Sequence, residues 1–204
     1  MQEVTDVNLA INDKPLVIFS HGKVTGPNSS RIKSLSQIAI RMGYEVESLD
    51  YRRLPTQERV NKLNQYLDEL QRPYVLVGTS MGGYVSAVSA LSHDPLGIFL
   101  ISPALYLDGY AEAQVEKLAC PTTVVHGWDD DIVPVQNVIS FAKSAKASLH
   151  IFAGGHRLRS KLSETESCFE QFLRECFISS QNKPEIMPEL ADSLNTESPR
   201  VVNQ

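Results

Sequence analysis

Cysteine is scarce in this sequence of 204 residues, which contains only three cysteines. Cys120, Cys168 and Cys176 form no Cys-x-x-Cys pair, and no cluster of cysteine and histidine has the spacing of metal ligands. A small, odd number of cysteines favours free thiols in a reducing compartment over a disulfide framework. We therefore expect neither a metal site nor a disulfide-stabilised secreted fold.

The sequence also lacks a run of basic residues and a long run of apolar ones. Its formal net charge is −5, which disfavours binding to nucleic acid or to an anionic membrane. No stretch approaches the roughly 18 apolar residues of a transmembrane helix, and the acidic N-terminus has no apolar segment typical of a signal peptide. These absences predict a cytoplasmic protein that binds neither nucleic acid nor membranes.

Short apolar runs alternate along the chain with stretches in which apolar residues recur at helical spacing. The runs are 16–20, 44–51, 74–79, 97–102, 122–126 and 148–152. Strand–helix alternation repeated about six times is typical of α/β proteins. We expect a mostly parallel sheet of about six strands with helices on both faces, in a single domain spanning residues 1–177. The polar segment 178–204 is expected to be a solvated tail.

Residue types at the ends of the amphipathic stretches predict where two helices begin. Thr56 is a typical N-cap residue ahead of the second amphipathic stretch. Ser163 and Glu166 have the Ser-x-x-Glu spacing of a capping box ahead of the last stretch. Both helices are therefore expected to start with a side chain that caps its own backbone.

The sharpest signal for chemistry is Gly78-Thr79-Ser80-Met81-Gly82, which follows a predicted strand and precedes a predicted helix. The pattern G-x-S-x-G in this context is typical of a nucleophile elbow, a strained turn that exposes a serine hydroxyl above the sheet. The N–H of Met81 would then point to where an oxyanion forms. The alternative is a small-residue turn that serves packing only.

A serine hydroxyl becomes a nucleophile only beside a base, which a third group orients. His156 follows two glycines directly after the last predicted strand, which favours it as the base over a structural loop histidine; His150 lies inside that strand. The acid is expected in the loop Asp129-Asp130-Asp131, after the preceding strand. Spacing alone leaves open which of the three carboxylates faces the histidine.

Further candidate site residues lie directly after the first two predicted strands, and two tyrosines are candidates for contact with the substrate. The turn after residue 20 offers a second oxyanion donor, the backbone N–H of Lys23, or is an ordinary glycine turn. Arg52 follows the second strand beside Arg53, where it would attract an anionic substrate or simply cover the surface. Tyr84 and Tyr106 are candidates for lining the substrate pocket.

With these residues in place, the sequence resembles the α/β-hydrolase superfamily over about residues 14–177. The order Ser80, Asp130, His156 is that of the superfamily, and residues 126–134 match its H-G-x-x-D-x-x-V-P pattern, which implies that Asp130 is the acid. The chain is similar to compact esterase-like and dienelactone-hydrolase-like members and to small bacterial esterases of the YqiA kind. The resemblance implies a compact α/β-hydrolase fold and a serine mechanism without metal or cofactor.

Two departures from the family pattern bear on the substrate. Gly155 stands before His156, where close relatives often carry an acidic or polar residue. The segment 102–120 is too short for the helical cap that many members insert there. The resemblance implies a serine carboxylesterase that acts through an acyl-enzyme, and the uncapped site favours small or exposed esters as its substrates. A thioesterase, lactonase or amidase with the same triad, and a non-catalytic binding or scaffold protein on the same fold, are the alternatives.

Overall fold

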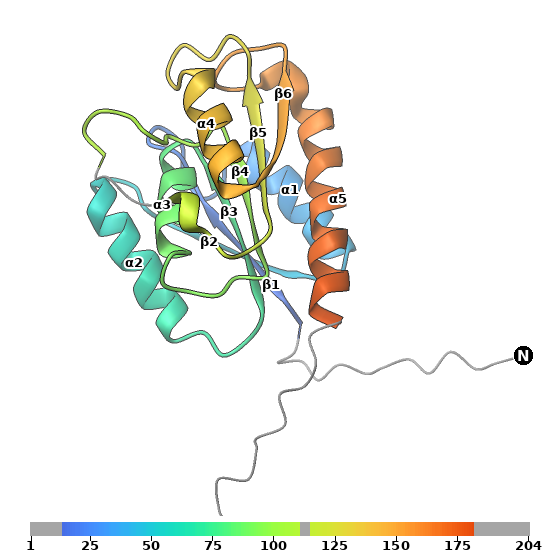
Figure 1. The fold of residues 1–204 in the computed structure, drawn as a ribbon. Coiled ribbons are helices and arrows are strands. Elements are labelled where there is room, and N and C mark those ends of the chain that lie inside the picture. The colour runs from blue at the N-terminus through green and yellow to red at the C-terminus, as the bar shows by residue number, and fades with distance from the viewer. Residues whose placement is uncertain (1–13, 111–114, 182–204) are drawn as a thin grey trace, which may run out of the picture.

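The computed structural model describes residues 14–110 and 115–181 (Figure 1). Strands and helices alternate along this part of the chain. In order, they are β1 (Leu16–Ser20), α1 (Ser30–Arg41), β2 (Glu45–Leu49), α2 (Thr56–Asp68), β3 (Tyr74–Thr79), α3 (Met81–Ser89), β4 (Gly97–Ile101), η1 (Val115–Lys117), β5 (Thr122–Gly127), α4 (Val135–Ala145), β6 (Ser148–Phe152), η2 (Arg159–Lys161) and α5 (Leu162–Gln181).

The strands form one six-stranded sheet in the order β2-β1-β3-β4-β5-β6, and every neighbouring pair is parallel. This confirms the predicted parallel sheet and compact α/β fold. The chain adds β2 on one side of β1 and then adds β3 to β6 on the other side. Because the winding direction reverses between β1 and β3, the loops after these strands diverge and leave room for a site at the carboxyl edge of the sheet.

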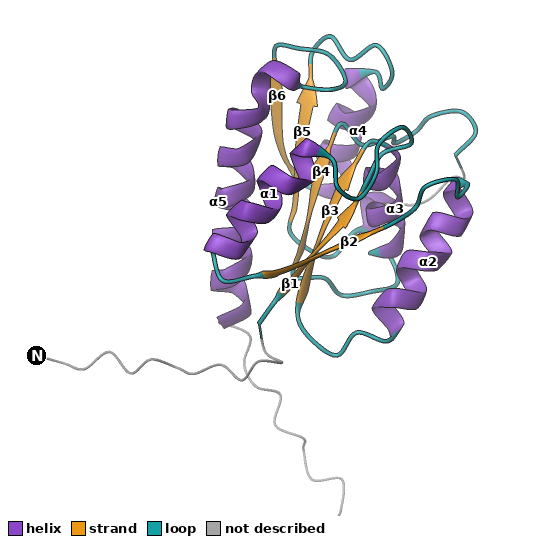
Figure 2. Cartoon of the chain, turned by 180° about the vertical axis from the view of Figure 1, so that it is seen from behind, coloured by secondary structure: helices purple, strands orange, loops and turns teal. Residues whose placement is uncertain are grey.

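Helices cover both faces of the sheet, as Figures 1 and 2 show from opposite sides. On one face, α2, α3 and α4 pack on strand residues such as Ile18 and Leu76. On the other, α1 and α5 pack on residues such as Val17 and Phe19. Successive strand residues point to opposite faces, so a strand covered on both sides needs apolar side chains at consecutive positions. This explains why β1 is buried along its whole length.

The two predicted helix caps are wrong. Thr56 is the first residue of α2, and Pro55 occupies the cap position without a capping side-chain hydrogen bond. Ser163 lies inside α5, and Glu166 accepts a hydrogen bond from the hydroxyl of Ser34 on α1. A tertiary contact between two helices therefore takes the place of the local capping box.

The described residues contain no cap domain above the carboxyl edge of the sheet. Between β4 and β5 they form loops and the short 3-10 turn η1. Helix α5 continues to Gln181, past the domain boundary predicted at residue 177, and the rest of the predicted tail lies outside the described residues. No described helix combines the length and hydropathy that crossing a bilayer requires.

Two glycines allow α3 to begin directly against the end of β1. A Cβ atom at Gly82 would lie 2.0 Å from the carbonyl oxygen of Ser20, and one at Gly78 would lie 2.4 Å from the carbonyl oxygen of Gly82. Both obstacles are backbone atoms, which cannot rotate away as a flexible side chain can. Close backbone approach therefore explains both glycines of the G-x-S-x-G pattern.

We expect Gly82→Ala to lower the free energy of unfolding by about 3 kcal/mol or more, at the upper end of overpacking costs, because helix and strand must separate to admit the methyl group. Equilibrium unfolding in urea measures the change. Gly26→Ala is the matched control, because its Cβ would meet only the Arg52 Cδ atom, at 3.6 Å. Equal losses of stability in the two variants would contradict the packing argument.

Candidate active site

Three residues predicted from the sequence follow three different strands at the carboxyl edge of the sheet. Ser80 follows β3, Asp130 lies in the loop after β5, and His156 lies in the loop after β6. Of the non-glycine residues with positive φ, Lys146 ends α4 at the opposite edge, whereas Ser80, Ser102 and three others follow strands at the carboxyl edge. Such backbone conformations cost energy and concentrate at functional sites. Topology and strain therefore both point to a site at this edge.

Ser80 occupies a strained turn between β3 and α3, with φ 54° and ψ −119°. Its N–H donates to the carbonyl of Ile101 at 2.9 Å, and its own carbonyl accepts from the N–H of Ala104 at 3.0 Å. These hydrogen bonds tie the turn to β4 and to the loop that follows β4. The neighbouring strand thus holds the serine in the conformation that the G-x-S-x-G pattern predicts.

A continuous chain of hydrogen bonds joins the three side chains. The carboxylate of Asp130 lies 2.8 Å and 3.0 Å from His156 Nδ1, and His156 Nε2 lies 2.9 Å from Ser80 Oγ. An ionised carboxylate only accepts hydrogen bonds, so Nδ1 carries the imidazole proton and Nε2 accepts from the serine hydroxyl. In this arrangement a histidine can take up the hydroxyl proton while the carboxylate stabilises its cation.

Of three adjacent aspartates, Asp130 is the one that turns inward. Its side chain is fully buried, and its Oδ1 also accepts from the N–H groups of Ile132 at 2.9 Å and Val133 at 2.8 Å. Burial by itself would raise the pKa of Asp130, but the hydrogen bonds from His156 and the two amides together hold that pKa below its usual value. Asp129 and Asp131 are exposed. Tertiary structure thus distinguishes carboxylates that spacing could not.

His126, which the sequence analysis did not assign to the site, lies beside Asp130. Its ring is fully buried, with Nε2 3.1 Å from the carbonyl oxygen of Val133 and 3.4 Å from Asp130 Oδ2. Because a carbonyl only accepts, Nε2 carries the proton. His126 therefore adds a donor beside the carboxylate that holds His156. The sequence signal that could have identified His126 is its place as the histidine that opens the H-G-x-x-D pattern, at the end of β5.

Two backbone amides predicted to receive an oxyanion lie in turns that border Ser80. Met81 is the first residue of α3. Lys23 follows Gly22, at which a Cβ atom would lie only 3.5 Å from the Cβ of Ser80. Within the residues that the structure describes, neither amide N–H has a protein acceptor. Both donors are thus available at turns next to the serine.

Two buried residues absent from the sequence-based site hold the turn that precedes Lys23. His21 Nε2 accepts from the N–H of Tyr51 at 2.9 Å, so its Nδ1 carries the proton and donates to the carbonyl of Gly22 at 2.7 Å. Arg59 of α2, only 2% exposed, donates Nη1 to the carbonyls of His21 at 3.2 Å and Gly22 at 3.3 Å. The turn is therefore fixed from its buried side.

Folding stability is expected to fall as the pH drops below about 6.5, because burial lowers the pKa of both His21 and His126. The unfolded chain then binds protons at a higher pH than the folded one, and each histidine contributes up to about 1.4 kcal/mol per pH unit between its unfolded and folded pKa. Asp130 titrates below this range, because its pKa lies under its ordinary 3.8.

Urea unfolding from about pH 8 to about pH 5 tests this expectation. The variant His126→Gln should show a shallower decline than the wild type, since one of the two titrating groups is removed. A wild-type stability that does not change over this range would contradict it.

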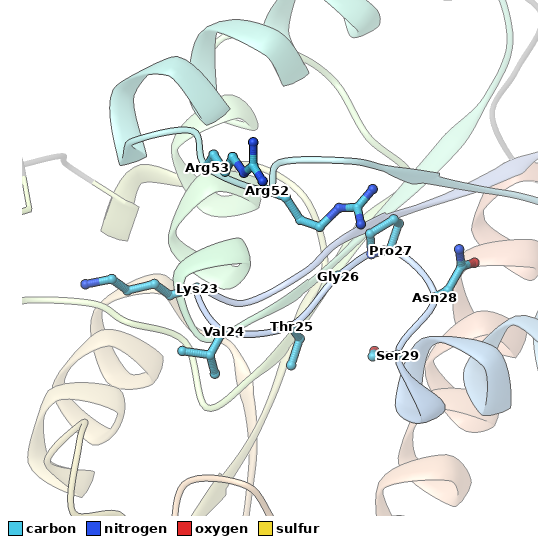
Figure 3. Close-up of a pocket in the computed structure, with 9 residues that line it drawn as sticks. All are labelled: Lys23, Val24, Thr25, Gly26, Pro27, Asn28, Ser29, Arg52 and Arg53. Atoms are coloured by element: carbon cyan, nitrogen blue, oxygen red, sulfur yellow. The ribbon is translucent and has the colours of Figure 1, made fainter.

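A groove of about 710 Å³ runs beside the Lys23 turn, between residues 23–29 and residues 52–53 (Figure 3). Three of the residues that line this groove are basic, Lys23, Arg52 and Arg53, and no residue that lines it is acidic. Arg52 makes a two-pronged ion pair with Asp50, at 2.5 Å to 3.0 Å. A second groove, of about 520 Å³, adjoins His156 on the side of Arg157 and Arg159.

The aromatic residues predicted to line the pocket lie outside both of these grooves. Tyr84 is 5% exposed and packs edge-on against Tyr110, with ring centroids 4.9 Å apart. Tyr106 is 49% exposed, and its carbonyl accepts a hydrogen bond from Asn137. Contact of either tyrosine with a substrate stays a prediction.

The cysteines and acidic residues take no part in a metal site within the described residues, where no group of three or more His, Cys, Asp or Glu could hold an ion. The three cysteines are free thiols, as predicted. Burial raises the pKa of Cys176 to about 12 and that of Cys120 to about 11. Thiols with pKa values this high are protonated at neutral pH, which disfavours their acting as thiolate nucleophiles.

A protein-family model described as Serine hydrolase matches residues 37–169. This span includes the serine turn, the aspartate loop and the histidine loop. Comparison with curated proteins gives no match.

Several solved structures have a similar fold. A candidate hydrolase of the alpha/beta superfamily from Xanthomonas campestris pv. campestris has a TM-score of 0.72 and 26% identity, over 79% of this chain and 98% of that chain. Est1E from Butyrivibrio proteoclasticus, solved with ferulic acid bound, has a TM-score of 0.72 and 18% identity, over 82% and 91%. The Pyrococcus furiosus esterase Pf2001 has a TM-score of 0.64 and 19% identity, over 79% and 83%. The likeness spans nearly the whole described chain.

Proposed function

Because the chain belongs to the serine hydrolase family, within the α/β-hydrolase superfamily, we propose that it is a carboxylesterase that cleaves small or exposed esters through an acyl-enzyme. The single observation that carries this proposal is the hydrogen-bonded chain from Asp130 through His156 to Ser80. Similarity to the esterase Pf2001, and to Est1E with its bound carboxylic acid, supports an ester as the substrate.

In the first half of the reaction, Ser80 Oγ attacks the ester carbonyl carbon while His156 Nε2 takes the hydroxyl proton. The carbonyl oxygen becomes an oxyanion, and Asp130 stabilises the imidazolium. The tetrahedral intermediate then collapses, the alcohol leaves with the proton from His156, and the acyl group stays on Ser80. In the second half, His156 deprotonates a water that attacks the acyl-enzyme, and the carboxylic acid is released.

The amides of Met81 and Lys23 are proposed to receive the oxyanion in both halves. Each donor of this kind contributes about 2.7–4 kcal/mol to lowering the barrier in comparable sites. The N-terminus of α3 adds the positive end of the helix dipole near the same oxygen. Base, nucleophile and donors all come from the chain itself, so the mechanism needs no metal or cofactor.

The alternatives differ in the bond cleaved or in the absence of chemistry. The same residues would hydrolyse a thioester, a lactone or an activated amide through the same steps. A binding or scaffold protein on this fold would have no use for a strained serine within 2.9 Å of an oriented imidazole. Hydrolysis is therefore favoured over a binding role. Similarity to the esterase Pf2001 favours esters over thioesters, lactones and amides as substrates.

Intact-mass labelling of the wild-type protein with a small fluorophosphonate tests the proposal. We expect one adduct per chain, located on Ser80 by peptide mapping, and turnover of short 4-nitrophenyl esters. Acetylthiocholine, a γ-lactone and an anilide of the same acyl size then rank the alternative substrates. A folded protein that takes up no label and turns over none of these compounds would overturn the proposal in favour of a binding protein.

The groove beside Lys23 supports a preference for anionic substrates. Arg53 makes no ion pair among the described residues, and Arg52 keeps part of its guanidinium facing the groove (Figure 3). The groove is positive although the whole chain carries a net charge of −5. A carboxylate or phosphate group attached to the ester would meet these cations as its carbonyl reaches Ser80.

We expect Arg53→Gln to reduce the ratio of kcat/KM for a hemisuccinate ester to that for a neutral acetate ester about fivefold, equivalent to ~1 kcal/mol for an exposed charge pair. The reduction should shrink at about 0.5 M salt, because salt screens exposed charges. Lys143→Gln is the matched control, since this exposed lysine lies in the last turn of α4 at the opposite edge of the sheet. A ratio unaltered by Arg53→Gln would contradict the anion preference.

A further inference from the structure

We propose that Arg59 is a positioning residue for the oxyanion site, which together with His21 orients and polarises the peptide between Gly22 and Lys23. In this proposal the N–H of Lys23 points at the oxyanion because His21 and Arg59 hold the carbonyl of the same peptide from the buried side of the turn. The inference rests on the proposed hydrolase function and adds to it a buried cation that touches neither substrate nor triad.

Arg59 is an unusual residue to find in the core. Its side chain is buried, and among the described residues no carboxylate forms an ion pair with it. A buried cation without a counter-ion is costly unless its donors are satisfied. Here they are satisfied by carbonyl oxygens of Leu54, His21 and Gly22, and the guanidinium lies 5.8 Å from the ring centroid of Tyr51. Its charge is therefore directed at backbone carbonyls.

The geometry of one peptide unit links Arg59 to the proposed oxyanion donor. The carbonyl of Gly22 and the N–H of Lys23 belong to the same peptide, which is trans, as are all the described peptide bonds. In a trans peptide these two groups point in opposite directions. Because the carbonyl points to His21 Nδ1 and Arg59 Nη1, the N–H points away from the buried side. Fixing the carbonyl thus fixes the direction of the N–H.

The same contacts strengthen the donor. Two donors converge on the Gly22 carbonyl, one of them a cation. Hydrogen bonds in a chain polarise one another, by about 10–30% per bond, so electron density is drawn toward the carbonyl oxygen and the N–H becomes a better donor. Gly22 also brings this peptide next to the nucleophile. The positive charge of Arg59 thereby reaches the oxyanion through one amide.

His21 can act in this way only in one protonation form, and its neighbours select that form. The N–H of Tyr51 points at Nε2, so the proton must reside on Nδ1, the nitrogen that faces the Gly22 carbonyl. Tyr51 is itself held by a hydrogen bond between its hydroxyl and Ser20 Oγ, 3.2 Å apart. The turn, the end of β1 and the start of α2 thus form one buried polar cluster.

A double-mutant cycle on hydrolysis of 4-nitrophenyl acetate tests the proposal in the full-length protein. Lys23→Pro deletes the N–H of the peptide, while Lys23→Ala keeps it and controls for the loss of the side chain. We expect Arg59→Met to lower kcat by about 10–100-fold, up to the size of losing one oxyanion donor, with KM altered less than about twofold. In the Lys23→Pro background, the same Arg59→Met change should lower kcat less than about threefold.

The proposal is overturned if the losses of kcat in the two single variants multiply in the double variant, or if Arg59→Met leaves kcat unaltered. A residue with a merely structural role would act independently of the Lys23 N–H. Thermal unfolding checks that each variant is folded. If Arg59→Met unfolds at the assay temperature, the cycle is repeated with Arg59→Lys, which keeps the charge but loses the guanidinium fork.

A measurement independent of turnover separates this proposal from the proposed function. In protein labelled with ¹⁵N-lysine, the amide resonance of Lys23 should shift more in Arg59→Met than the amides of the other lysines do. An unshifted Lys23 amide would overturn the polarisation argument even if the wild-type enzyme is an active esterase. A shifted amide in a protein without esterase activity would support it while the proposed function fails.

Discussion

Ser80→Ala is expected to lower kcat by about 10⁵- to 10⁶-fold, the loss seen when the nucleophile of a serine triad is removed. The substitution deletes the atom that forms the acyl-enzyme, and the oxyanion amides and groove left behind supply only the residual catalysis. The elbow at residue 80 should keep its strain, since alanine retains the Cβ atom and the backbone conformation of φ 54° and ψ −119°. We therefore expect a folded protein that binds ester and does not label with fluorophosphonate.

Ser160→Ala is the matched control for this experiment. Ser160 lines the groove next to His156 and carries the same functional group, but within the described residues no hydrogen bond joins it to the imidazole. It should keep full labelling and turnover. Label uptake in Ser80→Ala at the wild-type rate would show that another residue is the nucleophile.

Asp130→Asn is expected to reduce kcat by about 10⁴-fold, as the equivalent change does in a serine-protease triad. The carboxylate accepts hydrogen bonds from His156 Nδ1 and from the amides of Ile132 and Val133. A carboxamide must present its NH₂ group to one of these donors, which favours the imidazole tautomer with its proton on Nε2. That tautomer cannot accept the proton of Ser80.

Asp129→Asn and Asp131→Asn provide matched controls of the same chemistry on adjacent residues. Both side chains are exposed, so we expect each variant to retain kcat within about threefold, as for surface substitutions. Steady-state kinetics and the fluorophosphonate labelling rate measure all three variants. A larger loss in either control than in Asp130→Asn would show that the acid of the triad had been misassigned.

Much of the fold followed from the alternation of apolar runs with amphipathic stretches. The predicted runs 16–20, 74–79 and 148–152 coincide with β1, β3 and β6. The second run was predicted to span 44–51, whereas β2 covers only Glu45–Leu49. Being an edge strand, β2 pairs with β1 alone, so its length is set by where β1 ends. Apolar residues continue beyond that point because Tyr51 is buried, but they have no strand to pair with.

The order of the site residues could be predicted, but the choice among three aspartates could not be made from spacing. Asp129, Asp130 and Asp131 have the same side chain, and the backbone turn that sends one of them inward depends on amides and a histidine from elsewhere in the fold. The resemblance to α/β-hydrolases implied Asp130, and its contacts with His156 agree with that implication. The family's sequence pattern thus distinguished Asp130 from its two neighbours, which residue type and spacing could not do.

The buried polar residues around the site were missed for a physical reason. Arginine and histidine are usually exposed or only partly buried, so a general expectation places Arg59 and His126 at the surface. A signal was nevertheless present, because Arg59 lies one helical turn before Leu63 and two before Leu67, on the buried face of α2. An arginine in the apolar stripe of a helix, close to a predicted site, therefore indicates a buried cation with backbone partners.

The position of Ser80, the proposed nucleophile, ahead of Asp130 and His156 along the chain has a consequence for the newly made protein. A chain grows from its N-terminus, so β1, β3 and the serine turn emerge from the ribosome before Asp130 and His156 have been synthesised. Until the loop with His156 has been made and β6 has docked on β5, the hydroxyl of Ser80 has no base and stays an ordinary alcohol. Synthesis and docking of β6 together with the loop that carries His156 would thus give the nascent chain its proposed nucleophile.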